Sequence, residues 1–154
     1  MAQGPDKREI LEAAITQHET VIADFREGIR QMMANDGNVN EEEYDLQTQA
    51  MTAETSADVD RLAGQLAFAN RELEELIRMR QFIDEPHQAV QRGSVVKTDR
   101  ETFFVCASIE RFTVGDQAYF GLSSASPLYQ QMKGLRAGDR FSYGKTSYQI
   151  QEVY

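Results

Sequence analysis

The chain has 154 residues, of which 41% are hydrophobic and 27% are charged, and its formal net charge is −9. This composition is typical of a globular protein, and the net negative charge argues against general binding to the phosphates of nucleic acids. No apolar run is long enough for a membrane span or a signal peptide, and the single cysteine, Cys106, excludes an internal disulfide and a cysteine metal cluster. We therefore expect a cytoplasmic protein.

The charge is unevenly distributed along the chain. Residues 1–85 contain 8 Lys and Arg against 19 Asp and Glu, whereas residues 86–154 contain 8 against 6. Aromatic residues are skewed the other way, with 4 in the first part and 10 in the second. Two differently built domains are the simplest interpretation, with a boundary near Asp84-Glu85-Pro86.

The first part contains two heptad seams, in which the spacing alternates between three and four residues. The positions of the first seam are Leu11, Ile15, His18, Ile22, Phe25, Ile29 and Met32. Those of the second are Val59, Leu62, Leu66, Ala69, Leu73, Leu76, Arg80 and Ile83. Two seams of similar length predict an antiparallel coiled-coil hairpin over residues 1–85, because each helix alone would expose an apolar stripe. A two-helix piece of a larger bundle is the alternative. His18 is expected to pack within the seam, with a pH-sensitive role as the lesser option.

The segment between the seams is strongly acidic. Residues 34–60 contain no Lys or Arg and eight acids: Asp36, Glu41, Glu42, Glu43, Asp45, Glu54, Asp58 and Asp60. The run Asn35-Asp36-Gly37-Asn38 predicts a helix end and a turn, and Asn40 is a suitable N-cap for a helix that begins at Glu41. We expect an acidic tip near residues 34–58, and the spacing leaves open whether residues 45–58 are helical.

The second part is predicted to be a small antiparallel β domain with one short helix, which makes the whole chain an α+β protein. Alternating and β-branched residues indicate strands at 94–99, 102–107 and 118–122, and a closing hairpin at 140–143 and 147–153. Ser126 as N-cap and Pro127 as the first helical residue predict a short helix that ends near Gly134. Cys106 is expected to be buried in its strand, and His87 to be exposed in the linker.

The order of these parts resembles the Gre family of bacterial transcription elongation factors. The motif Ser126-Pro127-Leu128, followed at the family's spacing by Gly134 and Gly138-Asp139, carries the resemblance. Gly93-Ser94-Val95-Val96 and the last strand, 145–153, are also similar. The resemblance implies an FKBP-like fold for residues 86–154 and binding to RNA polymerase through Ser126, Pro127 and Leu128. It also implies insertion of the hairpin into the polymerase secondary channel, where tip acids help to hold a Mg²⁺ ion and stimulate cleavage of backtracked RNA.

The tip departs from the family pattern. Gly37–Tyr44 is one residue shorter than the corresponding family segment, and Asn38 stands where the family has a metal-binding Asp. The candidate acids for the cleavage reaction are Asp36, Glu41, Glu42 and Glu43, and Asp36 and Glu41 are the candidate ligands of a transient Mg²⁺ shared with polymerase. Ala125 replaces an Asp that the family often places before the Ser-Pro pair.

Three alternatives remain open at the level of the sequence. The first is a polymerase regulator that does not stimulate cleavage, and the second is a coiled-coil interaction module with another partner. The third is an enzyme such as an FKBP-like prolyl isomerase, which would need an aromatic-lined pocket. We expect the Gre-like reading, in which the protein is not itself an enzyme and holds no cofactor tightly. The sequence leaves the oligomeric state open.

Overall fold

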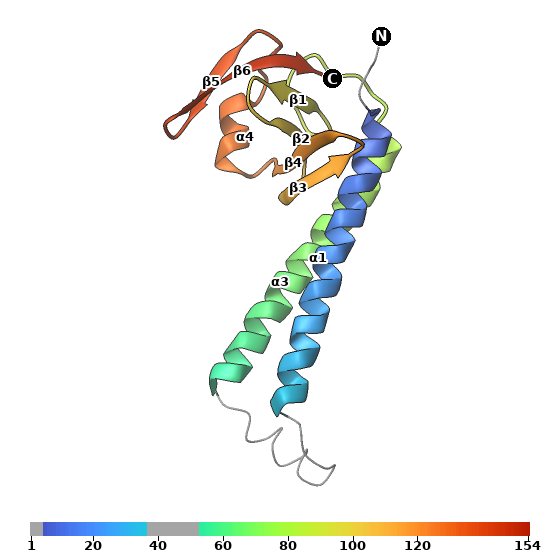
Figure 1. Ribbon diagram of the computed structural model, residues 1–154, viewed down its shortest axis with the longest axis vertical. Helices are drawn as coiled ribbons and strands as arrows, with labels where there is room; N and C mark the ends of the chain where they lie inside the picture. Colours follow the sequence, from blue (N-terminus) through green and yellow to red (C-terminus); the bar gives the residue numbers. More distant parts are fainter. Residues whose placement is uncertain (1–4, 37–52) are drawn as a thin grey trace. The chain divides into compact units, whose positions relative to one another are not determined.

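A computed structural model describes residues 5–36 and 53–154 of the chain (Figure 1). The described residues form two compact units. One unit combines the chain up to Gln17 with Glu74–Tyr154, and the other is formed by His18–Leu73. The domain boundary predicted near Pro86 stays a prediction.

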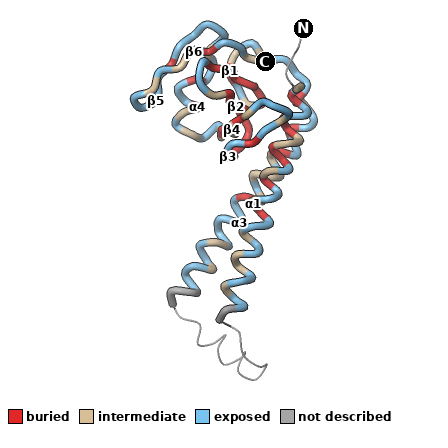
Figure 2. Tube along the Cα trace, viewed as in Figure 1, coloured by how far each residue is buried: buried red, intermediate tan, exposed pale blue. Residues whose placement is uncertain are grey.

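The unit His18–Leu73 consists of parts of two long helices, α1 (Lys7–Asp36) and α3 (Ala53–Arg78), which run antiparallel and side by side (Figure 1). Every described seam position in this unit is buried or half-buried, and most of the remaining positions are exposed (Figure 2). The His18 side chain is 3% exposed, and its Nε2 lies 2.8 Å from the backbone oxygen of Ala69 on the other helix. The predicted hairpin is therefore confirmed, and His18 packs within it.

The predicted positions Leu76 and Ile83 of the second seam are buried, but Arg80 between them is not. Beyond Arg78 the chain tightens into the 3₁₀ turn η1 (Met79–Gln81), so that Met79 is fully buried and Arg80 is exposed. A 3₁₀ turn has about 3.0 residues per turn instead of 3.6, which moves the inward-facing position back by one residue. The prediction of Arg80 as a seam residue was wrong. Its guanidinium instead donates two hydrogen bonds, of 2.9 and 2.7 Å, to the Glu12 carboxylate.

The other unit contains a six-stranded sheet with the strand order β3-β4-β2-β1-β6-β5. The strands are β1 (Val95–Thr98), β2 (Thr102–Cys106), β3 (Ile109–Val114), β4 (Gln117–Ser123), β5 (Arg140–Tyr143) and β6 (Thr146–Val153). Each pair of neighbours is antiparallel except β2 and β4, which are parallel. The short helix α4 (Pro127–Met132) follows β4. The predicted α+β class, with a mostly antiparallel sheet and one short helix, is confirmed, and the parallel pair corrects the purely antiparallel sheet.

Strand β3 was not predicted from the sequence, because it lies at the edge of the sheet and its buried and exposed residues do not alternate regularly. Only Ile109 and Phe112 are buried in it, and its register with β4 shifts between these two residues. Such a bulge interrupts the two-residue period from which strands are recognised.

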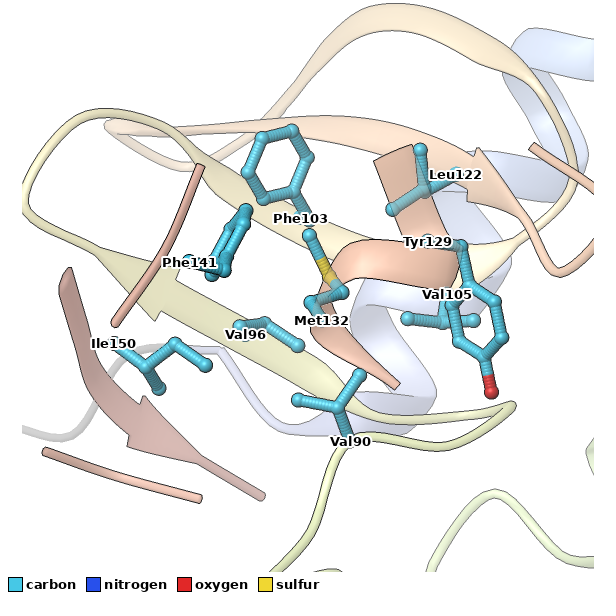
Figure 3. Close-up of a cluster of buried hydrophobic side chains, with 9 residues drawn as sticks. All are labelled: Val90, Val96, Phe103, Val105, Leu122, Tyr129, Met132, Phe141 and Ile150. Carbon is cyan, nitrogen blue, oxygen red and sulfur yellow. The ribbon is translucent and has the colours of Figure 1, made fainter. Parts of the chain in front are cut away.

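The centre of the sheet is buried on both faces. On the face toward α4, nine buried side chains form one cluster (Figure 3): Val90, Val96, Phe103, Val105, Leu122, Tyr129, Met132, Phe141 and Ile150. Val95 and Phe104 are opposite each other in register, alternate with members of this cluster and are also fully buried. The same unit contains the fully buried Leu11 of α1 and Leu76 of α3. Cys106 is buried, as predicted.

Candidate partner-binding site

The sequence places its candidate partner contacts at the start of α4, and the local structure there follows from the residue types. Ser126 has the extended backbone of an N-cap, with φ −74° and ψ 148°, and its Oγ accepts a hydrogen bond of 3.2 Å from the backbone N–H of Tyr129. Pro127 follows as the first helical residue, where its missing N–H costs nothing. The predicted cap is confirmed. Because the hydroxyl is used here as an acceptor, its proton remains able to donate to a partner.

The three motif residues differ in what they offer to a partner. Pro127 is exposed, whereas Leu128 is half-buried and packs against the core cluster. The next residue, Tyr129, is 5% exposed and belongs to the core. The surface available at the start of α4 is therefore the proline ring, part of the leucine side chain and the serine hydroxyl.

The glycines of the same motif have a structural role. Gly134 and Gly138 have φ values of +79° and +94°, in the left-handed region that favours glycine. The Asp139 carboxylate accepts a hydrogen bond of 2.8 Å from the backbone N–H of Arg136, and the Gly138 N–H donates to the Ile150 oxygen at 2.7 Å. The turns that connect α4 to β5 therefore explain why glycine stands at these two positions.

The acidic tip lies outside the described residues. Asp36 is the last residue of α1, and neither its side chain nor Glu41, Glu42 and Glu43 is described. Their roles in cleavage, and the proposed contact of Asp36 and Glu41 with Mg²⁺, stay predictions. Within 5–36 and 53–154, no three His, Cys, Asp or Glu side chains gather in a way that would hold a metal ion.

The linker between α3 and β1 holds a polar cluster that the sequence analysis missed. His87 was predicted to be exposed, but it is half-buried, and its Nδ1 lies 2.8 Å from the Oγ of the fully buried Ser94. Nearby, the Lys7 ammonium donates a hydrogen bond of 2.6 Å to the backbone oxygen of Glu85. Burial, and secondarily the charge of Lys7, lowers the pKa of His87. Burial also lowers the pKa of Lys7. The Lys7 contact could not be predicted from the sequence, because its acceptor is a backbone carbonyl, which every residue has.

A groove of about 650 Å³ lies between α1 and the edge strand β3. Its lining residues are Glu12, Ala13, Thr16, Gln17, Arg111, Phe112 and Thr113. This groove could not be predicted from the sequence, because one of its two walls is the unpredicted strand β3.

Most of the aromatic residues of the second part fill the core. Phe141 and Tyr148 stack with their ring centroids 4.8 Å apart, and Phe112 stacks on Tyr119 at 5.8 Å. Burial, together with a hydrogen bond to Tyr154, raises the pKa of Tyr119 to about 12. These rings contact one another in pairs, and Phe112 also lines the groove beside β3.

The geometry thus defines an α+β protein with a helical hairpin and a six-stranded sheet domain. Among the solved structures to which the chain is similar are two with the same protein name. The crystal structure of GreA factor homolog 1 (Gfh1) of Thermus thermophilus has 16% sequence identity and a TM-score of 0.34, with 92% of this chain and 95% of that chain covered. A structure of the transcription factor Gfh1 has 15% identity and a TM-score of 0.33, with 92% and 94% covered. These values are too low to assign a family, an activity or a partner.

No protein-family model matches the chain, and no curated protein matches it. In the part of the chain that the structure describes, every helix is too short or too polar to cross a membrane.

Proposed function

We propose that this protein is a Gre-like regulator of transcription elongation, which binds bacterial RNA polymerase in the cytoplasm and places its helical hairpin in the secondary channel. The observation that carries the proposal is the paired seam of α1 and α3, with His18 bonded to the Ala69 oxygen across it. A two-helix rod is narrow enough to enter a channel, and the segment that joins its helices, 37–52, contains four acids and no basic residue.

The start of α4 supports the docking part of the proposal. The exposed Pro127, the half-buried Leu128 and the Ser126 hydroxyl form a small, pre-ordered surface. Because the N-cap bond and the proline fix the backbone in advance, little conformational entropy is lost when a partner binds there.

The acidic segment accounts for the regulatory part of the proposal. Carboxylates such as Asp36, Glu41, Glu42 and Glu43 are hard oxygen ligands that suit Mg²⁺, and an acidic tip is attracted to a site that holds such ions. The reaction would remain that of polymerase, so the protein itself is neither an enzyme nor the owner of a tightly bound cofactor.

A binding experiment with bacterial core RNA polymerase tests the docking. We expect the wild-type protein to form a complex, and Pro127→Ala to weaken it by about tenfold through the loss of a buried contact. Gln131→Ala, an exposed change on the same helix, is the matched control and should bind as the wild type does. Failure of the wild-type protein to bind would leave the hairpin as an interaction module for another partner.

A cleavage experiment on backtracked transcription complexes tests the tip. Asp36→Ala and Glu41→Ala should abolish stimulated cleavage while polymerase binding is retained. Asp24→Ala, which removes one exposed carboxylate from the side of α1, is the control for net charge and should remain active. A protein that binds polymerase without any cleavage is a non-cleaving regulator, and the cleavage role would then be wrong.

A further inference from the structure

We infer that the groove between α1 and the edge strand β3 is a docking site for an extended, acidic segment of a partner protein, which adds to the sheet as a further strand. This site differs from the start of α4 and does not depend on the polymerase proposal.

The hairpin register shows which backbone groups of β3 are unused. Gly115 and Asp116 form a two-residue loop, with Gly115 at φ +60°, and the flanking pair is Val114 and Gln117. The pair that flanks a two-residue hairpin loop exchanges hydrogen bonds, and the next pair along an antiparallel ladder does not. The N–H and C=O of Thr113 therefore point away from β4, and no other described residue pairs with them. An incoming strand would find one donor and one acceptor there.

The groove lies where these groups point. Three consecutive strand residues, Arg111, Phe112 and Thr113, line it. Successive side chains of a strand point to opposite faces, so a groove lined by three in a row follows the edge of the strand and not one face. The other wall is formed by α1 residues 12, 13, 16 and 17, which share one side of the helix. A volume of about 650 Å³ is within the range of sites that hold small ligands or short peptide segments.

The charges of the groove favour an acidic occupant. Arg111 is exposed, and its guanidinium makes no ion pair with the described residues. Glu12 is the acid that lines the groove, but its carboxylate is held by two hydrogen bonds from Arg80. A carboxylate of an incoming segment would therefore meet an unpaired cation opposite a neutralised acid.

The opposite edge of the sheet provides an internal comparison. Strand β5 also ends in a two-residue loop, Gly144-Lys145, and Ser142 occupies the position equivalent to Thr113. Exposed edges normally invite unselective pairing, and the bulge and charged residues of β3 reduce that risk. The wall of α1 reduces it further, because it lies across the groove from the edge of β3. Selective strand addition is therefore expected at β3 and not at β5.

A phage-displayed library of linear 12-residue peptides is the probe. We expect selection on the intact protein to enrich extended sequences that contain Asp or Glu, with affinities then measured by fluorescence anisotropy. Thr113→Pro should weaken the enriched peptides by at least about tenfold, because proline removes the outward N–H without touching the bonds to β4. Ser142→Pro is the matched control and should leave binding unchanged. Arg111→Glu should also weaken binding by about tenfold.

A measurement on the unmodified protein guards against misfolding of the proline variant. Hydrogen exchange should show new protection at the Thr113 amide when an enriched peptide is added. The inference is overturned if no peptide is enriched, if binding survives Thr113→Pro, or if Thr113 gains no protection. Enriched peptides without acidic residues, or unaffected by Arg111→Glu, would overturn the acidic chemistry of the occupant.

Discussion

Replacing Ser126 separates its two proposed roles, capping α4 and contacting polymerase. Ser126→Ala removes the acceptor of the 3.2 Å bond from the Tyr129 N–H. Loss of an N-cap costs about 1 kcal/mol, within a range of roughly 0.5–2 kcal/mol. Because Tyr129 and Met132 of α4 are buried in the core, the lost helix stability should lower the stability of the whole fold. For a chain of this length, it corresponds to a melting temperature lower by about 2–4 °C, which circular dichroism can measure.

Ser126→Asn is the matched variant. Asparagine is as good an N-cap as serine, so the melting temperature should remain within about 1 °C of the wild type. It does not reproduce the hydroxyl, so polymerase binding should still weaken if that group contacts the partner. A melting temperature unchanged in Ser126→Ala would refute the capping argument. Normal polymerase binding by Ser126→Asn would refute a direct contact through the hydroxyl and leave Pro127 and Leu128 as the docking residues.

Three further predictions concern the core, the linker and the seam. Met132→Ala empties a fully buried position and should lower the free energy of unfolding by about 2–5 kcal/mol in denaturant titrations, whereas a change to Leu should cost under about 1.5 kcal/mol. His87 has a pKa below its ordinary value because of burial and the Lys7 charge, so its stabilising contribution is complete above about pH 6.5 and is lost as the pH falls through the lowered pKa. His87→Gln should flatten that part of the stability profile, and an unchanged profile would contradict this assignment. His18→Ala should lower the free energy of unfolding of the hairpin by about 2 kcal/mol, whereas His18→Leu should lower it by under about 1 kcal/mol. Leucine restores the packing, and the Ala69 carbonyl still accepts its helical hydrogen bond within α3 when the bond to His18 is lost. Equal losses in the two variants would show that the hydrogen bond, not the packing, dominates.

The helical part was predictable because its signal is local. Each seam repeats every seven residues over several turns, and burial of a seam position needs only the partner helix. The prediction was wrong at Arg80, where the chain leaves regular helix geometry. That change is set by the packing of Met79 in the sheet unit, which no repeat in the sequence records.

The sheet was only partly predictable because its topology depends on distant pairings. The hairpins β1–β2 and β5–β6 have short turns and clear strand patterns, and both were expected. Strand β3 has a bulge and two exposed charged residues, so its pattern resembles that of a loop. The parallel pairing of β2 with β4 follows only once β3 is known to connect them, and the groove beside β3 was missed for the same reason.

The residues that carry the Gre resemblance fall into two groups with different physical meaning. Gly134 and Gly138 adopt backbone conformations that favour glycine, and Ser126 caps a helix, so these positions are explained by the fold alone. The exposed Pro127 has no comparable structural requirement beyond its fixed φ, and the acids of residues 37–52 belong to the charged residue types that seldom form a core. A motif match dominated by the first group supports the fold more strongly than the function. The polymerase experiments therefore depend on the second group, and a variant such as Pro127→Ala is more informative than any glycine substitution.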